Sequence, residues 1–238
     1  MKQSAINVIE QQVICFRQNA GLNTTEPLRL KSLLLKLNVI TIYRPLSESF
    51  SGLSIKDKSG HRFMLVNSDH PRGRQHFTIA HELYHLFIED NPKPHRCDQE
   101  NKKDTHEKYA DKFASMLLLP DDGVKQMIPK RELEENKVSM ATILRLEQYF
   151  SVSHTYLLNR LCDLCLITPQ QKKEKSSIPI IKIATQYGFD TSLYKKGNEN
   201  LVIGDFGQKV NDLFDKGLIS EGYYIELLNK LNIDDQED

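Results

Sequence analysis

The chain has 238 residues, of which 39% are hydrophobic, with 32 basic and 32 acidic residues and 4 cysteines. Its zero formal net charge argues against non-specific nucleic-acid or membrane binding as the main activity. Four irregularly spaced cysteines exclude a disulfide-rich secreted scaffold, and neither a signal peptide nor about 20 consecutive apolar residues are recognisable, so we expect a soluble cytoplasmic protein.

Two helices are predicted at the start of the chain. Apolar residues recur at helical spacing over residues 6–16 and Gly21 follows them, which predicts an N-terminal helix within residues 1–24. A leucine-rich run at residues 28–37 follows a capping threonine and Pro27, a position where a helix tolerates proline. We therefore expect a second helix there.

Short β-rich segments come next and are separated by Pro, Ser and Gly. They predict a small antiparallel sheet with a hairpin turn at residues 58–60. The segments are residues 39–43, 50–55 and 63–66.

Helical patterns dominate the rest of the chain, so the fold class expected is α+β, mainly helical, with the small sheet packed on a central helix. The helices expected are residues 74–87, 104–118, 140–150 and 155–164. Residues 169–177, polar and rich in lysine, read as a linker to a helical C-terminal extension of unknown role at residues 178–238. The acidic end, residues 234–238, reads as a disordered tail.

The expected central helix contains a HExxH motif, His81-Glu82-Leu83-Tyr84-His85. Residues four apart return to nearly the same side of a helix, so the two imidazoles can chelate one ion. Glu82 lies on the neighbouring flank, where a carboxylate can act as general base towards the water that completes the coordination shell of a zinc ion. The motif therefore predicts a catalytic zinc site.

Such a site needs a third protein ligand from another element. Glu107 is a candidate because Ala110, Ala114 and Leu117 share its helix face, and this small, apolar face allows close approach to the first helix. Asp111, one turn further on, can orient a ligand from the second shell. Spacing alone leaves other third ligands open: Asp111, His106, His95 and Asp104.

These residues resemble the ImmA/IrrE family of zinc metallopeptidases, whose HExxH helix is followed by a segment of the form E-x-x-A-x-x-F-A-x-x-L-L-x-P. Residues 107–120 match that segment, and Asn67 matches a recurrent asparagine. We accordingly expect an ImmA/IrrE-like metallopeptidase domain at residues 25–168 that ends in a helical pair. The resemblance implies Zn²⁺ as cofactor, Glu82 as general base and three zinc ligands: His81, His85 and Glu107.

The resemblance also implies a function, a zinc-dependent endopeptidase that cleaves a cytoplasmic protein. By analogy, that protein is a transcriptional regulator such as a phage or mobile-element repressor, cleaved in response to stress. The alternative is a non-catalytic, zinc-containing regulatory module that binds a partner protein or DNA. Tyr84 motivates this alternative because the family usually has glycine there, and a tyrosine either packs outward or crowds the active-site cleft.

Other signals compete for a functional role. Residues 139–161 resemble a helix-turn-helix, but the second helix offers only His154, Asn159 and Arg160 to DNA, so we expect it to pack against the core. The pair Cys162 and Cys165 has no second CxxC partner and is interpreted as buried cysteines at a helix end. Three further histidines are expected to be surface or hairpin residues: His61, His70 and His76.

Overall fold

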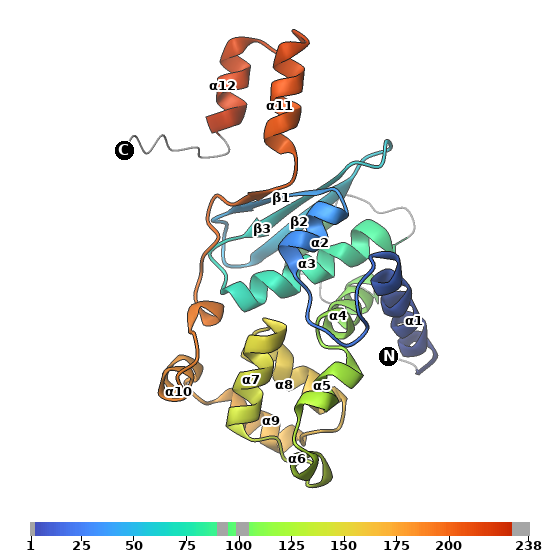
Figure 1. Ribbon diagram of the computed structural model, residues 1–238, viewed down its shortest axis with the longest axis vertical. Helices are drawn as coiled ribbons and strands as arrows, with labels where there is room; N and C mark the ends of the chain where they lie inside the picture. The colour runs from blue at the N-terminus through green and yellow to red at the C-terminus, as the bar shows by residue number, and fades with distance from the viewer. Residues whose placement is uncertain (1–2, 90–94, 99–104, 230–238) are drawn as a thin grey trace.

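Most helices gather on one side of a five-stranded sheet in the computed structural model, which describes residues 3–89, 95–98 and 105–229 (Figure 1). The helices before the C-terminal region are α1 (Gln3–Asn19), α2 (Leu30–Lys36), α3 (Arg72–Phe87), α4 (Thr105–Leu118), α5 (Asp121–Met127), α6 (Lys130–Glu134), α7 (Met140–Phe150) and α8 (His154–Asp163). After them come α9 (Pro169–Ser176), α10 (Ile180–Gln186), the 3-10 helix η2 (Ser192–Tyr194), α11 (Phe206–Asp215) and α12 (Glu221–Asn229). The expected α+β, mainly helical fold is confirmed.

The sheet is mixed, which corrects the prediction of a purely antiparallel one. Its strands, in the spatial order β4-β2-β3-β1-β5, are β4 (His95–Asp98), β2 (Phe50–Lys56), β3 (Arg62–Asn67), β1 (Val39–Arg44) and β5 (Val202–Ile203). Strands β2 and β3 form the expected antiparallel hairpin, but β1 pairs with β3 in parallel. The chain therefore crosses from β1 past β3 before it enters β2. Sequence periodicity identifies strands without revealing which of them pair, so it missed this crossover.

Helix α1 forms as predicted and is anchored by two side chains. The Phe16 ring makes edge-to-face contacts with Phe87 of α3 and Phe113 of α4, with ring centroids 5.8 and 5.7 Å apart. The buried guanidinium of Arg17 donates to the carbonyl oxygens of Asn23, Glu26 and Leu117. The bond to Leu117 ties α1 to the last turn of α4, where carbonyl groups lack partners within their own helix, and the other two hold the segment between α1 and α2.

Helix α2 begins later than predicted. It starts at Leu30, and its N-cap is Arg29 with no side-chain hydrogen bond, so the threonine cap expected before Pro27 is wrong. Thr25 instead bonds through its backbone N–H and its hydroxyl to the side chain of Asn23. An Asx turn therefore occupies the place of the cap, because a side-chain carbonyl can mimic a backbone turn.

The helix-turn-helix pair, α7 and α8, packs against the core as expected. Arg160 is 2% exposed and donates to the carbonyl of Leu119 and to the carboxylate of Asp121. His154 is also buried and bonds to Glu147. Two of the three side chains that could have contacted DNA, His154 and Arg160, are therefore buried and hydrogen-bonded within the protein.

The segment expected to be a linker, residues 169–177, forms helix α9. Thr168 and Gln171 make a capping box at its start, and the Lys175 carbonyl lies 3.0 Å from Nε2 of His154. The prediction failed because α9 is polar on all sides and has no hydrophobic periodicity, although the capping residues were a usable signal.

The C-terminal region contains a strand as well as the expected helices. Strand β5 pairs antiparallel with β1, and the side chain of Gln75 donates to the Gly197 carbonyl and accepts from Asn198. Residues 195–203 are thus joined to the sheet and to α3, whereas α11 and α12 stand on the other side of the sheet from α3 (Figure 1). Residues 234–238 lie outside the described part of the chain.

None of the helices in the described part of the chain is both long and apolar enough to cross a membrane.

Candidate metal centre

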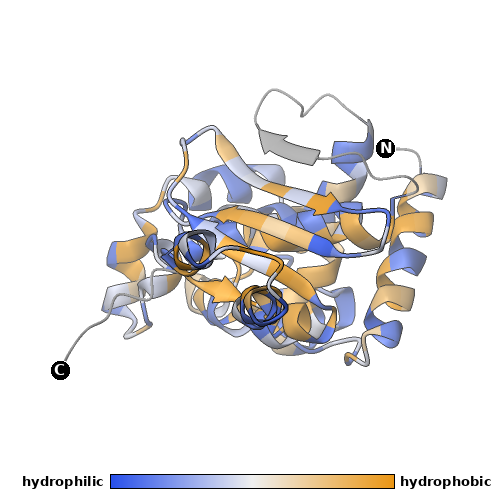
Figure 2. Ribbon diagram, turned by 90° about the horizontal axis from the view of Figure 1, so that it is seen from above, coloured by the Kyte–Doolittle hydropathy of each residue, from blue (hydrophilic) through white to orange (hydrophobic). Residues whose placement is uncertain are grey.

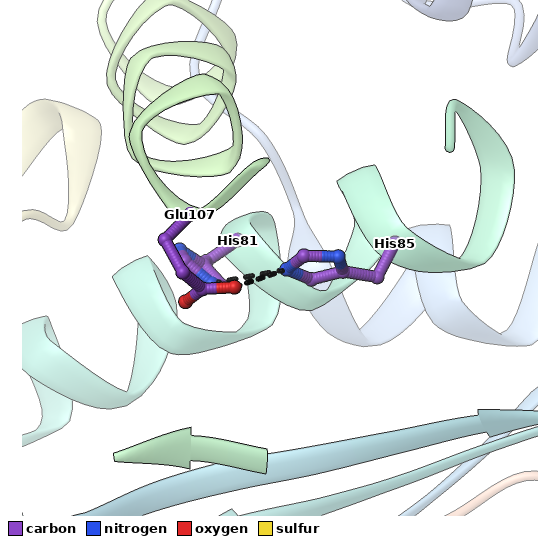
Figure 3. Close-up of side chains that lie close together, drawn as sticks. All are labelled: His81, His85 and Glu107. Carbon is purple, nitrogen blue, oxygen red and sulfur yellow. Dashed lines mark hydrogen bonds and ion pairs between the residues drawn. The ribbon is translucent and has the colours of Figure 1, made fainter. Parts of the chain in front are cut away.

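Helix α3 is largely buried, and it carries the HExxH motif across the middle of the fold. Strands β2 and β3 pack on it from one side and α4 from another. Residues 77–86 are all buried. Because His81 and His85 are one turn apart, both imidazoles point to the side of α3 that α4 covers (Figure 3).

Three side chains from two helices bring their ligand groups together at this point. Nε2 of His81 lies 3.3 Å from Nε2 of His85, and the Glu107 carboxylate oxygens lie 3.4 Å from the first nitrogen and 3.5 Å from the second. In Figure 3 the three side chains point toward one another. In a tetrahedral zinc site with bonds of about 2.0–2.1 Å, two ligand atoms are about 3.3–3.4 Å apart. The three side chains are therefore close enough to share a small divalent cation, with one ligand atom from each residue within 4.8 Å of the others.

Two outer carboxylates fix the orientation of the histidines. Nδ1 of His81 lies 3.0 Å from Oδ1 of Asp111, and Nδ1 of His85 lies 2.7 Å from Oε2 of Glu89. An ionised carboxylate only accepts hydrogen bonds, so each Nδ1 is assigned the ring proton and each Nε2 presents its lone pair to the centre. Two lone pairs and a carboxylate at this separation repel one another, and a cation between them converts that repulsion into attraction.

Helix α4 delivers Glu107 because its facing side is small. Ala110, Ala114 and Leu117 are fully buried on the side that contains Glu107, as the spacing predicted. Asp111 lies outside the group of three, and its Oδ1 is close to Nδ1 of His81, the ring nitrogen that points away from the centre.

The remaining candidates for the third ligand are not in this group. His106 is an exposed side chain whose Nδ1 lies 3.0 Å from Glu89. His95 lies in strand β4, whose side chains are outside the described part, and Asp104 is outside the described residues. Within the described residues, His81, His85 and Glu107 are the one group of three ligand side chains close enough to share an ion.

Glu82 faces the sheet side of α3 and is held there by strand β2. The Ser54 hydroxyl donates a hydrogen bond of 2.5 Å to Oε2 of Glu82, and both residues are buried. Gly52 permits this approach: a Cβ atom there would lie 2.6 Å from Cγ2 of Thr78 and 3.6 Å from Oε1 of Glu82. Strand β2 therefore sets both the position of the Glu82 carboxylate and the space beside it.

Tyr84 does not lie among the three ligand atoms. Tyr84 is 6% exposed, and its ring packs against Phe113 of α4, with centroids 5.6 Å apart, and stands nearly perpendicular to the His85 ring. The ring thus fills the interface between α3 and α4. It does not separate the ligand side chains of His81, His85 and Glu107.

The other histidines and the cysteines lie elsewhere. His61 is exposed and bonds to Asp57 in the β2–β3 turn. The prediction for His70 is wrong, because this histidine is buried and its Nε2 lies 3.0 Å from the Glu48 carbonyl, which helps to hold the loop before β2. His76, half-buried, bonds through Nδ1 to the Ser151 carbonyl.

The expectation of buried cysteines is also wrong in part. Cys165 is exposed and Cys162 is half-buried. Cys165 follows the last turn of α8 with a φ of +56°, and this turn carries its side chain into solvent.

Sequence reasoning missed three residues of the site: Glu89, Ser54 and Gly52. Glu89 had a usable signal, since it lies four residues after His85 and therefore on the same helix face. Ser54 and Gly52 had none, because their role depends on how the sheet packs on α3.

The comparison with curated proteins gave no match. A family model described as an IrrE N-terminal-like domain, of the M78 peptidases, matches residues 36–162, more than half of the chain. The matched range includes β1 to β3, the HExxH helix and Glu107, the elements that build the metal centre. The chain therefore belongs to the family of peptidases with an IrrE N-terminal-like domain.

Proposed function

We propose that the protein is a zinc-dependent endopeptidase in which His81, His85 and Glu107 hold the ion and Glu82 is the general base. The observation that carries this proposal is the convergence of the His81, His85 and Glu107 side chains, whose ligand atoms all lie within 4.8 Å of one another, with both histidines oriented by outer carboxylates. A zinc ion bound there would polarise a peptide carbonyl and lower the pKa of a water molecule to about 7.

The side chains of the protein supply the rest of the chemistry. Glu82 accepts the proton of the attacking water and holds it until the amine of the cleaved peptide bond takes it up. The Ser54 hydroxyl fixes one oxygen of that carboxylate, so the proton moves to and from a carboxylate of defined orientation. Glu89 and Asp111 keep the histidine Nε2 atoms pointed at the centre.

The proposed substrate is a protein in an extended conformation. Strand β4 is an edge strand of the described sheet and pairs with β2 next to the residues that hold Glu82. Its outer edge can pair with a peptide main chain. We infer from the family resemblance that the substrate is a cytoplasmic transcriptional regulator such as a phage or mobile-element repressor.

Metal analysis tests the site separately from the reaction. Purified wild type should contain about one zinc per chain, and His81→Ala should lose it, with circular dichroism to check folding. If the two proteins contain equal metal, the proposed ligand set is wrong. The metal found also decides between zinc and another divalent ion, since imidazole and carboxylate accept several.

Cleavage is tested by incubating the protein with regulators encoded in its own genome and identifying fragments by mass spectrometry. Glu82→Gln should retain the metal and abolish the fragments, since an amide cannot accept the proton. A cellular phenotype that survives Glu82→Gln but not His81→Ala would instead support the alternative, a zinc-containing regulatory module. The pair α11 and α12, which stands apart from the metal centre, is the structural feature that favours this alternative.

A further inference from the structure

The face of the sheet that points away from α3 is apolar, although nothing in the catalytic proposal uses it. Gly52 and Ser54 face α3, so the alternating residues of β2, Leu53 and Ile55, face the other way. Directly paired residues share a face, which adds residues from the neighbouring strands to Leu53 and Ile55. The apolar residues of this outer face are Ile40, Ile42, Leu53, Ile55, Phe63, Leu65 and Val202, and Arg44 follows them at the end of β1.

All seven of these side chains are at least partly exposed, and Ile55 is 37% exposed. A sheet with one face towards solvent normally alternates between apolar residues inside and polar residues outside. Figure 2 looks onto this side of the sheet, with α11 and α12 seen nearly end on, and hydrophobic residues run along the strands. The outer face therefore has the composition of a surface that another element covers.

Helices α11 and α12 stand on this same side and form a helical hairpin, in which α11 is amphipathic. They pack on each other through the stacked rings of Phe214 and Tyr224, 4.5 Å apart, and Val210 is their one buried residue among those described. Two such short helices gain little stability without tertiary packing. The apolar residues that the hairpin exposes are Leu213, Phe214, Leu218, Tyr223 and Ile225.

The hairpin is acidic, and this charge indicates what covers it. Residues 205–229 contain five acidic and two basic residues, and one of the two, Lys209, is paired with Asp205. With the C-terminal residues included, 205–238 have nine acidic and three basic residues, a net charge of −6 in a chain that is neutral overall. Two hairpins of this charge repel each other, as do the hairpin and an anionic membrane.

We propose that the outer sheet face and the α11–α12 hairpin together form a docking surface for a basic, amphipathic helix of a partner protein. Helices are the elements that cover open sheet faces, and an apolar stripe on the partner would lie on the seven sheet residues. Its lysine and arginine side chains would face the acidic residues of the hairpin. This surface is on the side of the sheet opposite Glu82, so docking does not depend on the peptidase proposal.

A model peptide tests the docking surface with the full-length protein. The probe is a fluorescent, helical peptide of leucine and lysine with leucine on one face, and the controls are the same peptide with glutamate for lysine and a scrambled lysine peptide. We expect the ordered lysine peptide to bind best, with an affinity that falls as salt rises. Equal binding of the glutamate peptide, or no binding of the lysine peptide, would overturn the proposal.

Surface variants locate the binding. Asp212→Lys combined with Asp215→Lys should weaken binding of the lysine peptide about tenfold or more, and Leu218→Ser with Ile55→Ser should weaken it similarly. All four side chains are exposed, so these variants should fold. Glu134→Lys, on the exposed face of α6, is the matched charge control and should bind as the wild type does. Unchanged binding in the two double variants would overturn the assignment.

Two further measurements separate the remaining outcomes. Hydrogen exchange with the peptide present should slow in residues 39–66 and 206–229 and not in α6; protection elsewhere would contradict the location. Light scattering should find a monomer under the same conditions. The contrary result is a dimer that Leu218→Ser dissociates, with the outer sheet face then exposed. That result would show that a second copy, and not a basic helix, is the occupant.

Discussion

The hydroxyl of Ser54 on strand β2 donates a hydrogen bond of 2.5 Å to Oε2 of Glu82 on helix α3. The bond joins the two parts of the fold, since the strand belongs to the sheet and the glutamate lies within the HExxH motif. A buried carboxylate with a fixed partner has one orientation, and a general base works best when its orientation is set before the reaction. The sheet thus contributes to the metal centre without supplying a ligand.

Ser54→Ala should separate orientation from metal binding. The variant should keep its zinc and lose about tenfold in kcat with a smaller change in KM, because the carboxylate loses its fixed partner but not its place. The measurement is steady-state cleavage of the protein that the wild type cleaves, beside metal analysis. Ser47→Ala, an exposed serine in the preceding loop, is the control. An unchanged kcat would exclude the positioning role.

Gly52→Ala should destabilise the protein. A Cβ atom at this position would lie 2.6 Å from Cγ2 of Thr78 and 3.0 Å from the Leu65 carbonyl oxygen, so strand and helix must move apart. We expect a loss of about 1–3 kcal/mol in the free energy of unfolding, measured by urea denaturation, together with lower activity. Gly222→Ala, where no atom lies within 4 Å of the added Cβ, should leave stability nearly unchanged.

The two outer carboxylates should differ in their effect on metal affinity. Glu89→Ala is expected to weaken zinc binding about 10- to 100-fold, because it removes the acceptor for Nδ1 of His85. Asp111→Ala should weaken it less, since the Asp111 side chain is 55% exposed against 18% for Glu89, and water can replace it. Competition with a chromophoric chelator measures both, and Glu135→Ala is an exposed control. The reverse order of the two effects would contradict this ranking.

The buried pair of His154 and Glu147 predicts a pH dependence of stability. Burial alone would lower the pKa of His154, but the hydrogen bond and charge of Glu147 and the Lys175 carbonyl outweigh it and raise the pKa above its ordinary value of 6.5. Nδ1 and Nε2 both face acceptors, which suits the doubly protonated ring. Tyr194 also donates to Glu147, and the charge of Lys175 opposes that of the histidine.

A raised pKa in the folded state means that this stabilisation is complete below pH 6.5 and is lost as the pH rises through the folded-state pKa. Compared with wild type, His154→Gln should therefore be less stable by about 2–3 kcal/mol near pH 5.5, and the difference should shrink at higher pH. His70 and His76, whose pKa values burial lowers, affect both proteins equally. Denaturation curves across this range measure the difference, and a constant gap would contradict the protonated pair.

The sequence predicted the centre of the site better than its surroundings. The placement of His81 and His85 on one side of a helix follows from helix geometry, which acts within one element. Spacing alone left the third ligand open, and the resemblance to the ImmA/IrrE family selected Glu107. Ser54 acts on Glu82 from a strand 28 residues away, and its role depends on a sheet whose parallel β1–β3 pair no local pattern indicated. Helix α9 was missed because its surface is polar on all sides, and β5 because two residues carry too little pattern.

Strand β5 has a consequence for where the domain can be cut. Its residues, 202–203, lie far beyond the family match at 36–162, yet it is the edge strand next to β1. A fragment trimmed to the matched range would leave main-chain groups of β1 without their β5 partners. Unpaired edge strands tend to pair with other chains. Such a fragment should precipitate or form oligomers, whereas a fragment extended through residue 204 should not aggregate.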